Sequence, residues 1–359
     1  MGESKGNRLR QILLQKPESL GEILISILAV PLSLVIGFIF LWILGYEPIE
    51  AIGHLLYGMF GSRITLMRTL VKTTPLILTG LCVAFAFRAG LFNIGGEGQL
   101  YMGAMAAAIV GYVIAPPKLI HIPLALLAAA LLGGIWAAIP GALKAKLGAH
   151  EVIITIMMNY TAILFTSYLA SGPLKEPGQW QWVSKTPDIS PSAILFRFSP
   201  KSLLSGAIFV ALICAIIMHL ILTRTKLGYE IRATGLNPKA AEYAGISVSK
   251  NIILAMLISG IFAGVGGGVE VLGTHHYFIT GFSVGLGFDG IAVAVLGRNT
   301  AFGTVLAALL FGALKSGAIE MQLHTGVPNE IIFVIQSIII LFVAAPQIIR
   351  IIFRIKKED

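Results

Sequence analysis

Apolar stretches long enough to cross a lipid bilayer recur along almost the whole of this chain. The hydrocarbon core of a bilayer requires roughly 17–25 helical residues per crossing. Only 12% of the residues are charged and 56% are hydrophobic, whereas soluble domains carry about 25% charged residues. The chain therefore lacks the polar surface of a soluble domain, and we expect an all-α, polytopic membrane helix bundle.

The apolar runs predict about ten transmembrane helices. They are expected at Ile23–Leu44, Leu70–Phe87, Gly98–Ala115, Ile122–Leu143, Val152–Ala170, Leu203–Thr223, Ile252–Leu272, Ser283–Leu296, Phe302–Ile319 and Ile331–Ile348. The eighth run is short and rich in glycine. The first run is too long for the core of a signal peptide, so we expect it to be retained as a helix.

The basic residues between the runs set the expected orientation. With ten crossings and the N-terminus inside, most of the 26 lysine and arginine residues fall in cytoplasmic segments, as the positive-inside rule requires. We therefore expect a cytoplasmic tail at residues 1–22, a transmembrane domain at 23–348 and a second cytoplasmic tail at 349–359, in the plasma membrane. The formal net charge is +9, but the basic residues form no single stripe, so no nucleic-acid partner is expected.

Two of the expected outer segments are more than simple turns. Tyr46–Gly61 has apolar residues on helical spacing, which predicts an amphipathic helix lying on the outer interface. Ser171–Lys201 is long and contains Trp180 and Trp182. Those tryptophans can be an interfacial anchor or part of a docking surface for an external partner.

The segment 224–250 is the one long insertion expected on the cytoplasmic side. Asn237 is a good N-cap, Pro238 suits the first helical position, and Gly245 can end a helix that continues to Ala244. The sequence therefore predicts a short, rigid helix that points into the cytoplasm. Two interpretations are open: an ordinary connection, or a docking element for a soluble partner.

Two carboxylates lie in matching glycine-rich settings within the expected spans. Glu97 follows Gly95 in the pattern G-x-acid-G, and Asp289 follows Gly287 in the same pattern, which indicates an internal repeat of the kind found in transporters. Each carboxylate can cap the N-terminus of a half-helix or line a translocation path. Lys315, deeper in a later span, is expected to extend its side chain to the interface.

Amide and aromatic side chains near these carboxylates are candidates for a polar substrate. Asn93, Gln99 and Asn159 can hydrogen-bond a nucleobase or a ribose, and Phe92 and Phe288 can supply apolar or stacking surface. No metal-ligand spacing recurs among the seven histidines, so no metal or other cofactor is expected. The chain also lacks G-x-x-x-x-G-K-[ST], so any ATP-driven function requires a separate ATPase.

Several stretches resemble the permease subunits of ABC importers. PKAAEYAGI, at Pro238–Ile246, resembles their coupling-helix signature, an alanine pair followed closely by glycine. The stretches similar to nucleoside permeases, which work with a lipoprotein of the basic-membrane-protein type, are Thr74–Ala104, Glu151–Tyr160 and Ser171–Gly178. Leu257–Gly273 resembles the permeases for ribose, nucleosides and branched-chain amino acids, and Gly287–Gly303 is shared with sugar permeases. The resemblance extends from Leu66 to Leu341.

The resemblance implies a permease subunit that forms a translocation path for nucleosides and is not an enzyme. An external lipoprotein would deliver the substrate, and a second permease, related but different, would complete the path. A cytoplasmic ABC ATPase would dock on the coupling residues Asn237, Pro238, Lys239, Ala240, Ala241, Glu242 and Gly245. Two alternatives stay open: a ribose-type sugar permease, and a secondary transporter driven by proton coupling through Glu97 or Asp289.

Overall fold

The computed structural model describes residues 20–178, 183–200, 202–328 and 330–344. Within these ranges the regular elements are helices, apart from two isolated antiparallel bridges, one between Lys185 and Ile279 and one between Arg197 and Ser205. Apart from residues 20–22, the expected tails lie outside the described residues, and so do Trp180 and Trp182. The chain forms two compact units, a smaller one of residues up to Gly53 and from Met321, and a larger one of His54–Glu320.

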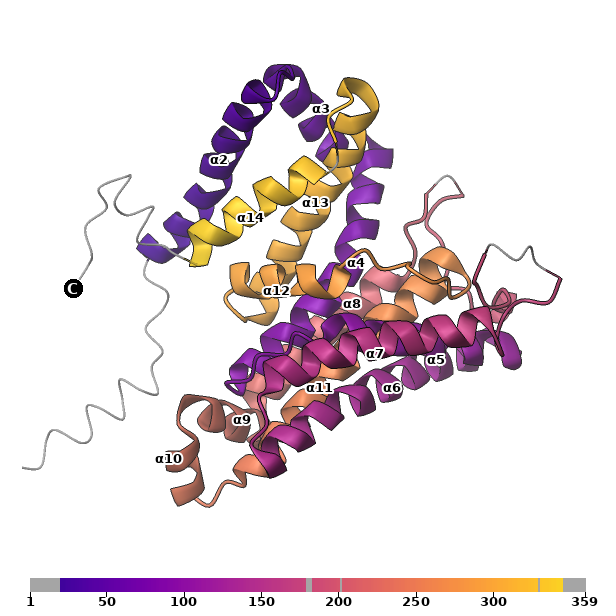
Figure 1. Ribbon diagram of the computed structural model, residues 1–359, viewed down its shortest axis with the longest axis vertical. Coiled ribbons are helices and arrows are strands. Elements are labelled where there is room, and N and C mark those ends of the chain that lie inside the picture. The colour runs from indigo at the N-terminus through magenta and orange to yellow at the C-terminus, as the bar shows by residue number, and fades with distance from the viewer. Residues whose placement is uncertain (1–19, 179–182, 201, 329, 345–359) are drawn as a thin grey trace, which may run out of the picture. The chain divides into compact units, whose positions relative to one another are not determined.

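The helices follow the order expected from the apolar runs (Figure 1). They are α2 (Leu20–Ile43), α3 (Pro48–Phe60), α4 (Arg63–Arg88), α5 (Gly96–Val113), α6 (Lys118–Leu147), α7 (Glu151–Ser171), α8 (Ala207–Arg224), α9 (Lys226–Leu236), α10 (Pro238–Tyr243), α11 (Val248–Glu270), α12 (Leu286–Leu296), α13 (Ala301–Thr325) and α14 (Glu330–Ala344). A short 3-10 turn, η1, covers Pro191–Ala193, and a π-helical turn, η2, covers Val271–His275. Each of the ten expected spans therefore overlaps a helix.

Six of these helices are long and apolar enough to cross a membrane: α4, α6, α7, α8, α11 with η2, and α13. The apolar stretches in α2, α12 and α14 are shorter, namely Pro31–Ile43, Leu286–Leu296 and Glu330–Ile339. Helix α12, with 11 residues, spans about 16 Å, or half of a hydrocarbon core. A multi-pass membrane helix bundle is thus supported, while the count of ten crossings stays a prediction.

Glycines bring the helices of the larger unit into close contact around α11. A Cβ built on Gly103 of α5 would lie 2.2 Å from the carbonyl oxygen of Gly264, and one built on Gly133 of α6 would lie 2.6 Å from the Gly264 Cα. Only glycine permits such an approach, which is the packing expected of small residues four apart in membrane helices. The G-x-x-x-G patterns at Gly260, Gly264 and Gly268 therefore place α11 against α5 and α6.

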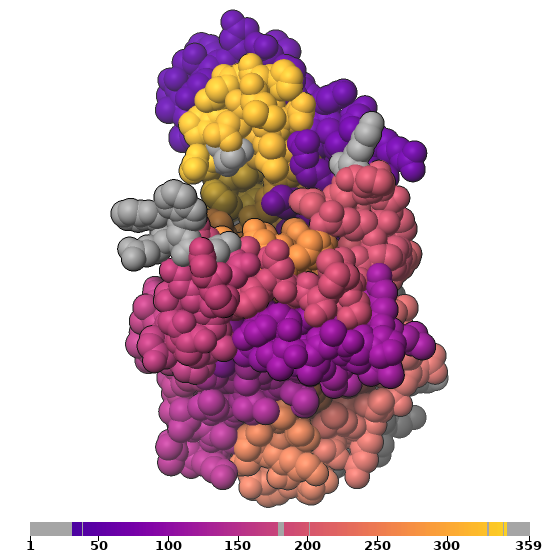
Figure 2. All heavy atoms as spheres, turned by 90° about the vertical axis from the view of Figure 1, so that its right-hand side faces the viewer, coloured from indigo at the N-terminus to yellow at the C-terminus, as the bar shows by residue number. Residues whose placement is uncertain are grey.

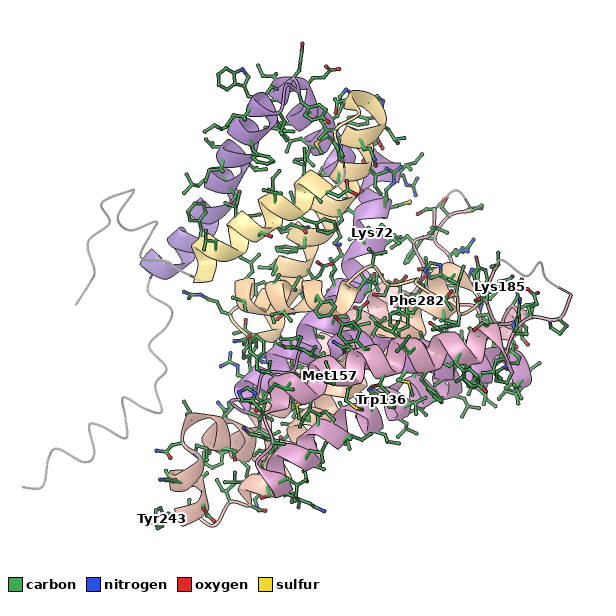
Figure 3. All side chains as sticks on the ribbon, in the orientation of Figure 1. Lys72, Trp136, Met157, Lys185, Tyr243 and Phe282 are labelled. Carbon is green, nitrogen blue, oxygen red and sulfur yellow. The ribbon has the colours of Figure 1, made fainter. Side chains whose placement is uncertain are left out.

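The exposed and the buried helices of the larger unit differ in their side chains. Helix α4 is buried along most of its length, whereas α6, α7 and α8 each expose a stripe of leucine, isoleucine and aromatic side chains. Such a stripe would be unfavourable in water but suits a bilayer. The indole nitrogen of Trp136 donates to the Met158 carbonyl over 3.2 Å and joins α6 to α7 (Figure 3).

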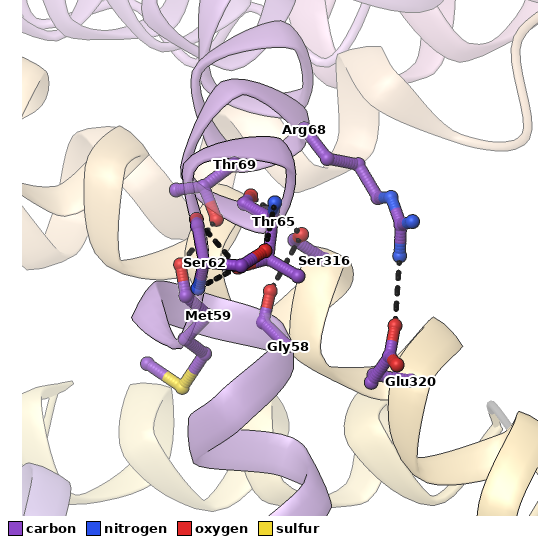
Figure 4. A network of polar contacts seen from close by, with 8 residues as sticks. All are labelled: Gly58, Met59, Ser62, Thr65, Arg68, Thr69, Ser316 and Glu320. Carbon is purple, nitrogen blue, oxygen red and sulfur yellow. Dashed lines mark hydrogen bonds and ion pairs between the residues drawn. The ribbon is translucent and has the colours of Figure 1, made fainter. Parts of the chain in front are cut away.

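The start of α4 is held by a polar network with α13 (Figure 4). Ser62 and Thr65 form a capping box, in which the Ser62 Oγ accepts from the Thr65 amide over 3.1 Å. The Ser316 hydroxyl donates to the Gly58 carbonyl over 2.9 Å, and the Arg68 guanidinium lies 3.2 Å from the Glu320 carboxylate. A helix is present where one was predicted at 46–61, as α3, and its Gly58 face packs on α13 because Gly317 leaves room for it. Its place on the outer interface stays a prediction.

The smaller unit contains α2 and α14, which pack against each other. A Cβ on Gly37 of α2 would lie 2.8 Å from the Ile335 Cγ1 of α14. Leu41 of α2 and Ile335 and Ile339 of α14 are buried. This contact brings the first and last helices of the described chain together.

Candidate functional site

The chain between α4 and α5 leaves the helical path at residues 89–95, here called the α4–α5 break. The side chain of Asn93 fills it. Its Oδ1 accepts from the Gly95 amide over 2.9 Å and from the Gln99 Nε2 over 3.0 Å. Its Nδ2 donates to the Ser259 Oγ over 2.8 Å and to the Gln99 Oε1 over 3.1 Å. Asn93 and Gln99 are both buried, so a complete polar network stabilises the break.

Asn159 of α7 holds the same break from the other side. Its Oδ1 accepts from the Gly98 amide over 2.8 Å, and its Nδ2 donates to the Ile94 carbonyl over 2.9 Å. One of the free amides in the first turn of α5 is thereby satisfied. The structure brings together the three amides predicted from the sequence, and in this conformation they bind the protein's own backbone and one another.

Glu97 caps a helix other than its own. The Gly287 amide, in the first turn of α12, donates to the Glu97 Oε2 over 2.6 Å. The Ser283 hydroxyl accepts from the Leu286 amide over 3.2 Å in the same turn. A Cβ on Gly287 would lie 2.2 Å from the Glu97 amide nitrogen, so glycine is required there. The N-terminus of α12 therefore meets the N-terminus of α5, with the carboxylate between them.

Asp289 has a different partner from Glu97, despite the matching sequence setting. Its Oδ2 lies 2.7 Å from the Nζ of Lys315 in the middle of α13. The predicted extension of Lys315 to the interface is therefore wrong for this conformation. The two carboxylates differ because a cation lies within reach of only one of them, and pairing lowers the cost of a charge inside a membrane segment.

The two candidate aromatic residues also differ in accessibility. Phe92, in the α4–α5 break, packs edge-on against Phe87 with ring centroids 4.9 Å apart. Phe288, in the first turn of α12, is 46% exposed, and Val284 just before that turn is 79% exposed. The start of α12 thus presents apolar surface beside the Asp289–Lys315 ion pair.

The predicted coupling helix exists as α10 and has the predicted ends. The Asn237 Oδ1 accepts from the Ala240 amide over 3.1 Å, Pro238 is the first helical residue, and Gly245 has a φ of +79° after the helix. Most of the candidate coupling residues are exposed, but Ala241 is buried. Tyr243, which is 93% exposed, points outward from the end of α10 (Figure 3). A tyrosine this exposed is typical of a docking surface.

The segment 224–250 contacts the chain just before the α4–α5 break. A Cβ on Gly235, near the end of α9, would lie 2.4 Å from the Arg88 carbonyl oxygen. The Arg88 Nε in turn donates to the Asn299 carbonyl over 2.7 Å, in the turn between α12 and α13. The ends of α4, α9 and α12 therefore meet at one place, close in sequence to Asn93.

The predicted external segment is folded against the opposite end of the larger unit. The Thr186 amide donates to the Phe278 carbonyl over 2.9 Å, and the Ser190 amide donates to the Gly111 carbonyl over 2.8 Å. Lys185 binds Glu176 and Asp188 and lies 4.4 Å from the ring centroid of Tyr277. Figure 2 shows the pink atoms of this segment spread beside the purple atoms around the end of α5. Its described residues form an ordered surface rather than a simple loop.

The described residues contain no group of three or more His, Cys, Asp or Glu side chains that could hold a metal ion. The site therefore offers hydrogen bonds, one accessible ion pair and aromatic surface. These groups can recognise a polar molecule, and none is arranged as a nucleophile with a base.

Comparison with known proteins decides the family. Residues 65–344 match the family described as "Branched-chain amino acid transport system / permease component". This chain belongs to that permease family. The permease is 46% identical over 94% of its length to the guanosine ABC transporter permease NupP of Bacillus subtilis, with 98% of that protein covered. No solved structure matches it.

Two further relatives carry different names. The nucleoside ABC transporter permease NupB of Lactococcus lactis is 36% identical over 92% of this permease and 93% of its own length. The glucose ABC transporter permease TsgB13 of Haloferax volcanii is 33% identical over 90% of this permease and 87% of its own length. The expected resemblance to ABC permeases is therefore confirmed, and it covers nearly the whole chain.

Four residues of the permease site were not singled out as site candidates from the sequence: Ser259, Gly235, Arg88 and, as the partner of Asp289, Lys315. Ser259 is the only polar residue in the apolar stretch Ile252–Val269 of α11, directly before Gly260, and its hydroxyl also donates to the Cys82 carbonyl over 2.7 Å. A single hydroxyl within a membrane helix was therefore the available signal for it. The signal for Lys315 was its charge within a span.

Proposed function

We propose that this permease is the membrane subunit of an ABC importer that carries nucleosides. The proposal rests on one observation, the 46% identity along 94% of the chain to a permease named for guanosine. The amide cluster and the aromatic surface at the start of α12 support it, because both suit a heterocyclic, hydroxylated substrate. The permease would perform no covalent chemistry.

The proposed path includes the N-termini of α5 and α12 and the residues around them. These are Asn93, Glu97, Gln99, Asn159, Asp289, Phe92 and Phe288. Helix N-termini at a break are suited to a polar substrate because their amides point at it. In the described conformation the side-chain amides bind one another and the backbone, so they can bind substrate only if these hydrogen bonds break. Alternating access would switch the permease between one state with these hydrogen bonds and a second state in which they are broken.

Energy would come from a separate ABC ATPase that docks on the segment 224–250. Asn237, Pro238, Lys239, Ala240, Glu242 and Gly245 supply the exposed part of the proposed docking surface. Ala241 is buried and would contribute by fixing the position of α10. The Gly235–Arg88 contact then offers a direct route from the docked ATPase to the α4–α5 break.

The assembly would contain further proteins. A second permease, related but different, would complete the path, and an external lipoprotein would dock on the ordered segment that follows α7. Both termini would be cytoplasmic, with residues 1–22 and 349–359 as tails and residues 23–348 as the permease domain in the plasma membrane. Lipid would surround the apolar stripes of α6, α7 and α8, and no cofactor or nucleic acid would be needed.

The test is uptake by proteoliposomes that contain the permease with its ATPase, partner permease and binding lipoprotein. We expect ATP-dependent accumulation of radiolabelled guanosine that other nucleosides reduce. A sugar importer is the second candidate, because the Haloferax relative is named for glucose, and competition by glucose or ribose alone would favour it. Accumulation abolished by a protonophore but not by vanadate would instead point to a secondary transporter.

A further inference from the structure

Asp289 and Lys315 form an ion pair within two of the predicted membrane spans, where charged side chains are rare and usually functional. Asp289 is in the first turn of the half-length helix α12, and Lys315 is in the middle of α13. Their side chains are 16% and 15% exposed, so the pair is not sealed inside the protein. A charged pair that faced hydrocarbon would be unfavourable by several kcal/mol. This face therefore meets water or another polar surface when the transporter is assembled.

The turn between α12 and α13 is held without this ion pair. The Thr300 hydroxyl donates to the Gly297 carbonyl over 2.9 Å and accepts from the Gly303 amide over 3.1 Å. A Cβ on Gly297 would lie 2.4 Å from the Thr304 amide nitrogen, so the turn is closely packed. Ion pairs in low-dielectric surroundings add little stability compared with apolar packing. A purely structural role thus leaves the pair poorly explained.

The surroundings of the pair suit a nucleoside. Phe288, next to Asp289 in sequence, and Val284, one turn earlier, are exposed. An accessible phenyl ring can stack on a nucleobase. Beside it, the carboxylate accepts hydrogen bonds from hydroxyl or amino groups, and the ammonium donates to carbonyl oxygens or ring nitrogens. The start of α12 therefore combines the three kinds of group that a nucleoside needs.

We propose that Asp289 and Lys315 form a specificity-determining site that binds nucleoside substrates through the exposed start of α12. This inference rests on the proposed function. Lys315 then contacts the substrate and helps to determine specificity, besides serving as the counter-ion of Asp289. During transport the substrate would contact the two charged groups that now form an ion pair with each other.

The test compares four variants in the reconstituted transporter: Asp289→Asn, Lys315→Gln, the charge swap Asp289→Lys with Lys315→Asp, and the control Arg68→Gln. The control breaks the Arg68–Glu320 ion pair, which also joins α13 to another helix. Competition of guanosine uptake by adenosine, cytidine, leucine and ribose is measured for each. We expect the single variants to change the competitors' rank order, with at least one ratio shifting about tenfold, equivalent to 1.4 kcal/mol, while Arg68→Gln leaves the order unchanged.

The charge swap distinguishes a role in substrate recognition from a structural role. If the pair only joined α12 to α13, the swap would restore uptake with the wild-type rank order, and that result would overturn the inference. Altered rank order in the swap supports it. Where a variant does not assemble, the wild-type transporter is photolabelled with 8-azidoadenosine and mapped by mass spectrometry. Label on residues 284–289 or beside Lys315 supports the site, and label confined elsewhere overturns it.

These outcomes distinguish the inference from the proposed function. A wild-type transporter that accumulates no nucleoside contradicts the proposed function itself. If the wild-type transporter accumulates nucleosides, but the variants keep its rank order of competitors and the photolabel lies away from α12 and Lys315, only the inference is contradicted.

Discussion

The Gly287 amide donates to the Glu97 carboxylate over 2.6 Å, so a side chain at the start of α5 caps the start of α12. The same glycine touches the Glu97 backbone. The N-termini of α5 and α12, each a positive dipole end, are thus joined through one carboxylate. This arrangement explains why a carboxylate is tolerated inside a membrane segment. The negative charge and the hydrogen bond of Glu97 contribute separately to it.

Replacing Glu97 tests these two contributions. Glu97→Gln keeps an acceptor for the Gly287 amide and loses only the charge, so the expected loss is about 0.3–1 kcal/mol. Glu97→Ala leaves that buried amide without a partner, and the expected loss is about 1–3 kcal/mol. Thermal unfolding of the purified permease in detergent measures both. Equal losses for the two variants would mean that the charge, and not the hydrogen bond, holds α12.

Asn93 is predicted to be required for a stable α4–α5 break. Asn93→Ala removes one hydrogen-bond partner each from the Gly95 amide, Gln99 and Ser259, and a buried group left without a partner costs about 1–3 kcal/mol. We expect a clear fall in the yield of folded permease and in its unfolding temperature. Thr161→Ala is the control, because the exposed Thr161 hydroxyl bonds only within α7. An Asn93→Ala protein as stable as the control would contradict the network.

The sequence predicted local features well and distant pairings poorly. The cap, first residue and end of α10 depend on Asn237, Pro238 and Gly245, which are close in the chain, so rules of helix capping were enough. The partner of Glu97 lies 190 residues away, and no pattern in the sequence specifies such a distance. Glu97 and Asp289 share a motif, yet only Asp289 has a lysine within reach. Their different roles therefore come from packing, not from the motif.

Gly235 is predicted to matter for coupling rather than for docking. Gly235→Ala would place a Cβ 2.4 Å from the Arg88 carbonyl, and overpacking of this kind usually costs about 1–3 kcal/mol. We expect ATPase subunits to remain bound and to hydrolyse ATP, while nucleoside uptake per ATP falls several-fold.

Gly228→Ala is the matched control, because Gly228 is also in α9 but touches Ile221 of α8. Uptake and ATP hydrolysis are measured together in proteoliposomes for both variants. If Gly228→Ala uncouples transport as strongly, the effect comes from distortion of α9, and the contact with Arg88 has no special part in coupling.

The segment 183–200 is predicted to loosen in acid because of His276. Burial and the nearby Arg197 guanidinium hold the pKa of His276 below its ordinary value of 6.5. The folded state thus binds this proton less tightly than the unfolded state, so stability is full above pH 6.5 and falls as the pH drops below it. The rate of amide hydrogen exchange in residues 183–200, corrected for intrinsic rates, should rise as the pH is lowered from 7.5 to 5.5. His276→Gln should remove most of this dependence; an unchanged pH profile in that variant would show that His276 is not its cause.

The last prediction concerns sidedness. The segment after α7 and the tip of α10 lie at opposite ends of the larger unit (Figure 1), and the distribution of basic residues predicts that the α10 end faces the cytoplasm. Single cysteines are placed at Asp188 and at Tyr243, both exposed, in a background with Cys214→Ala. Cys82 is retained because it is fully buried. A membrane-impermeant maleimide applied to intact cells should label Asp188→Cys at once and Tyr243→Cys only after the membrane is opened. Because the two positions test opposite faces of one folded unit, the reverse pattern would invert the whole topology, and labelling of both from outside would mean that the α10 end does not face the cytoplasm.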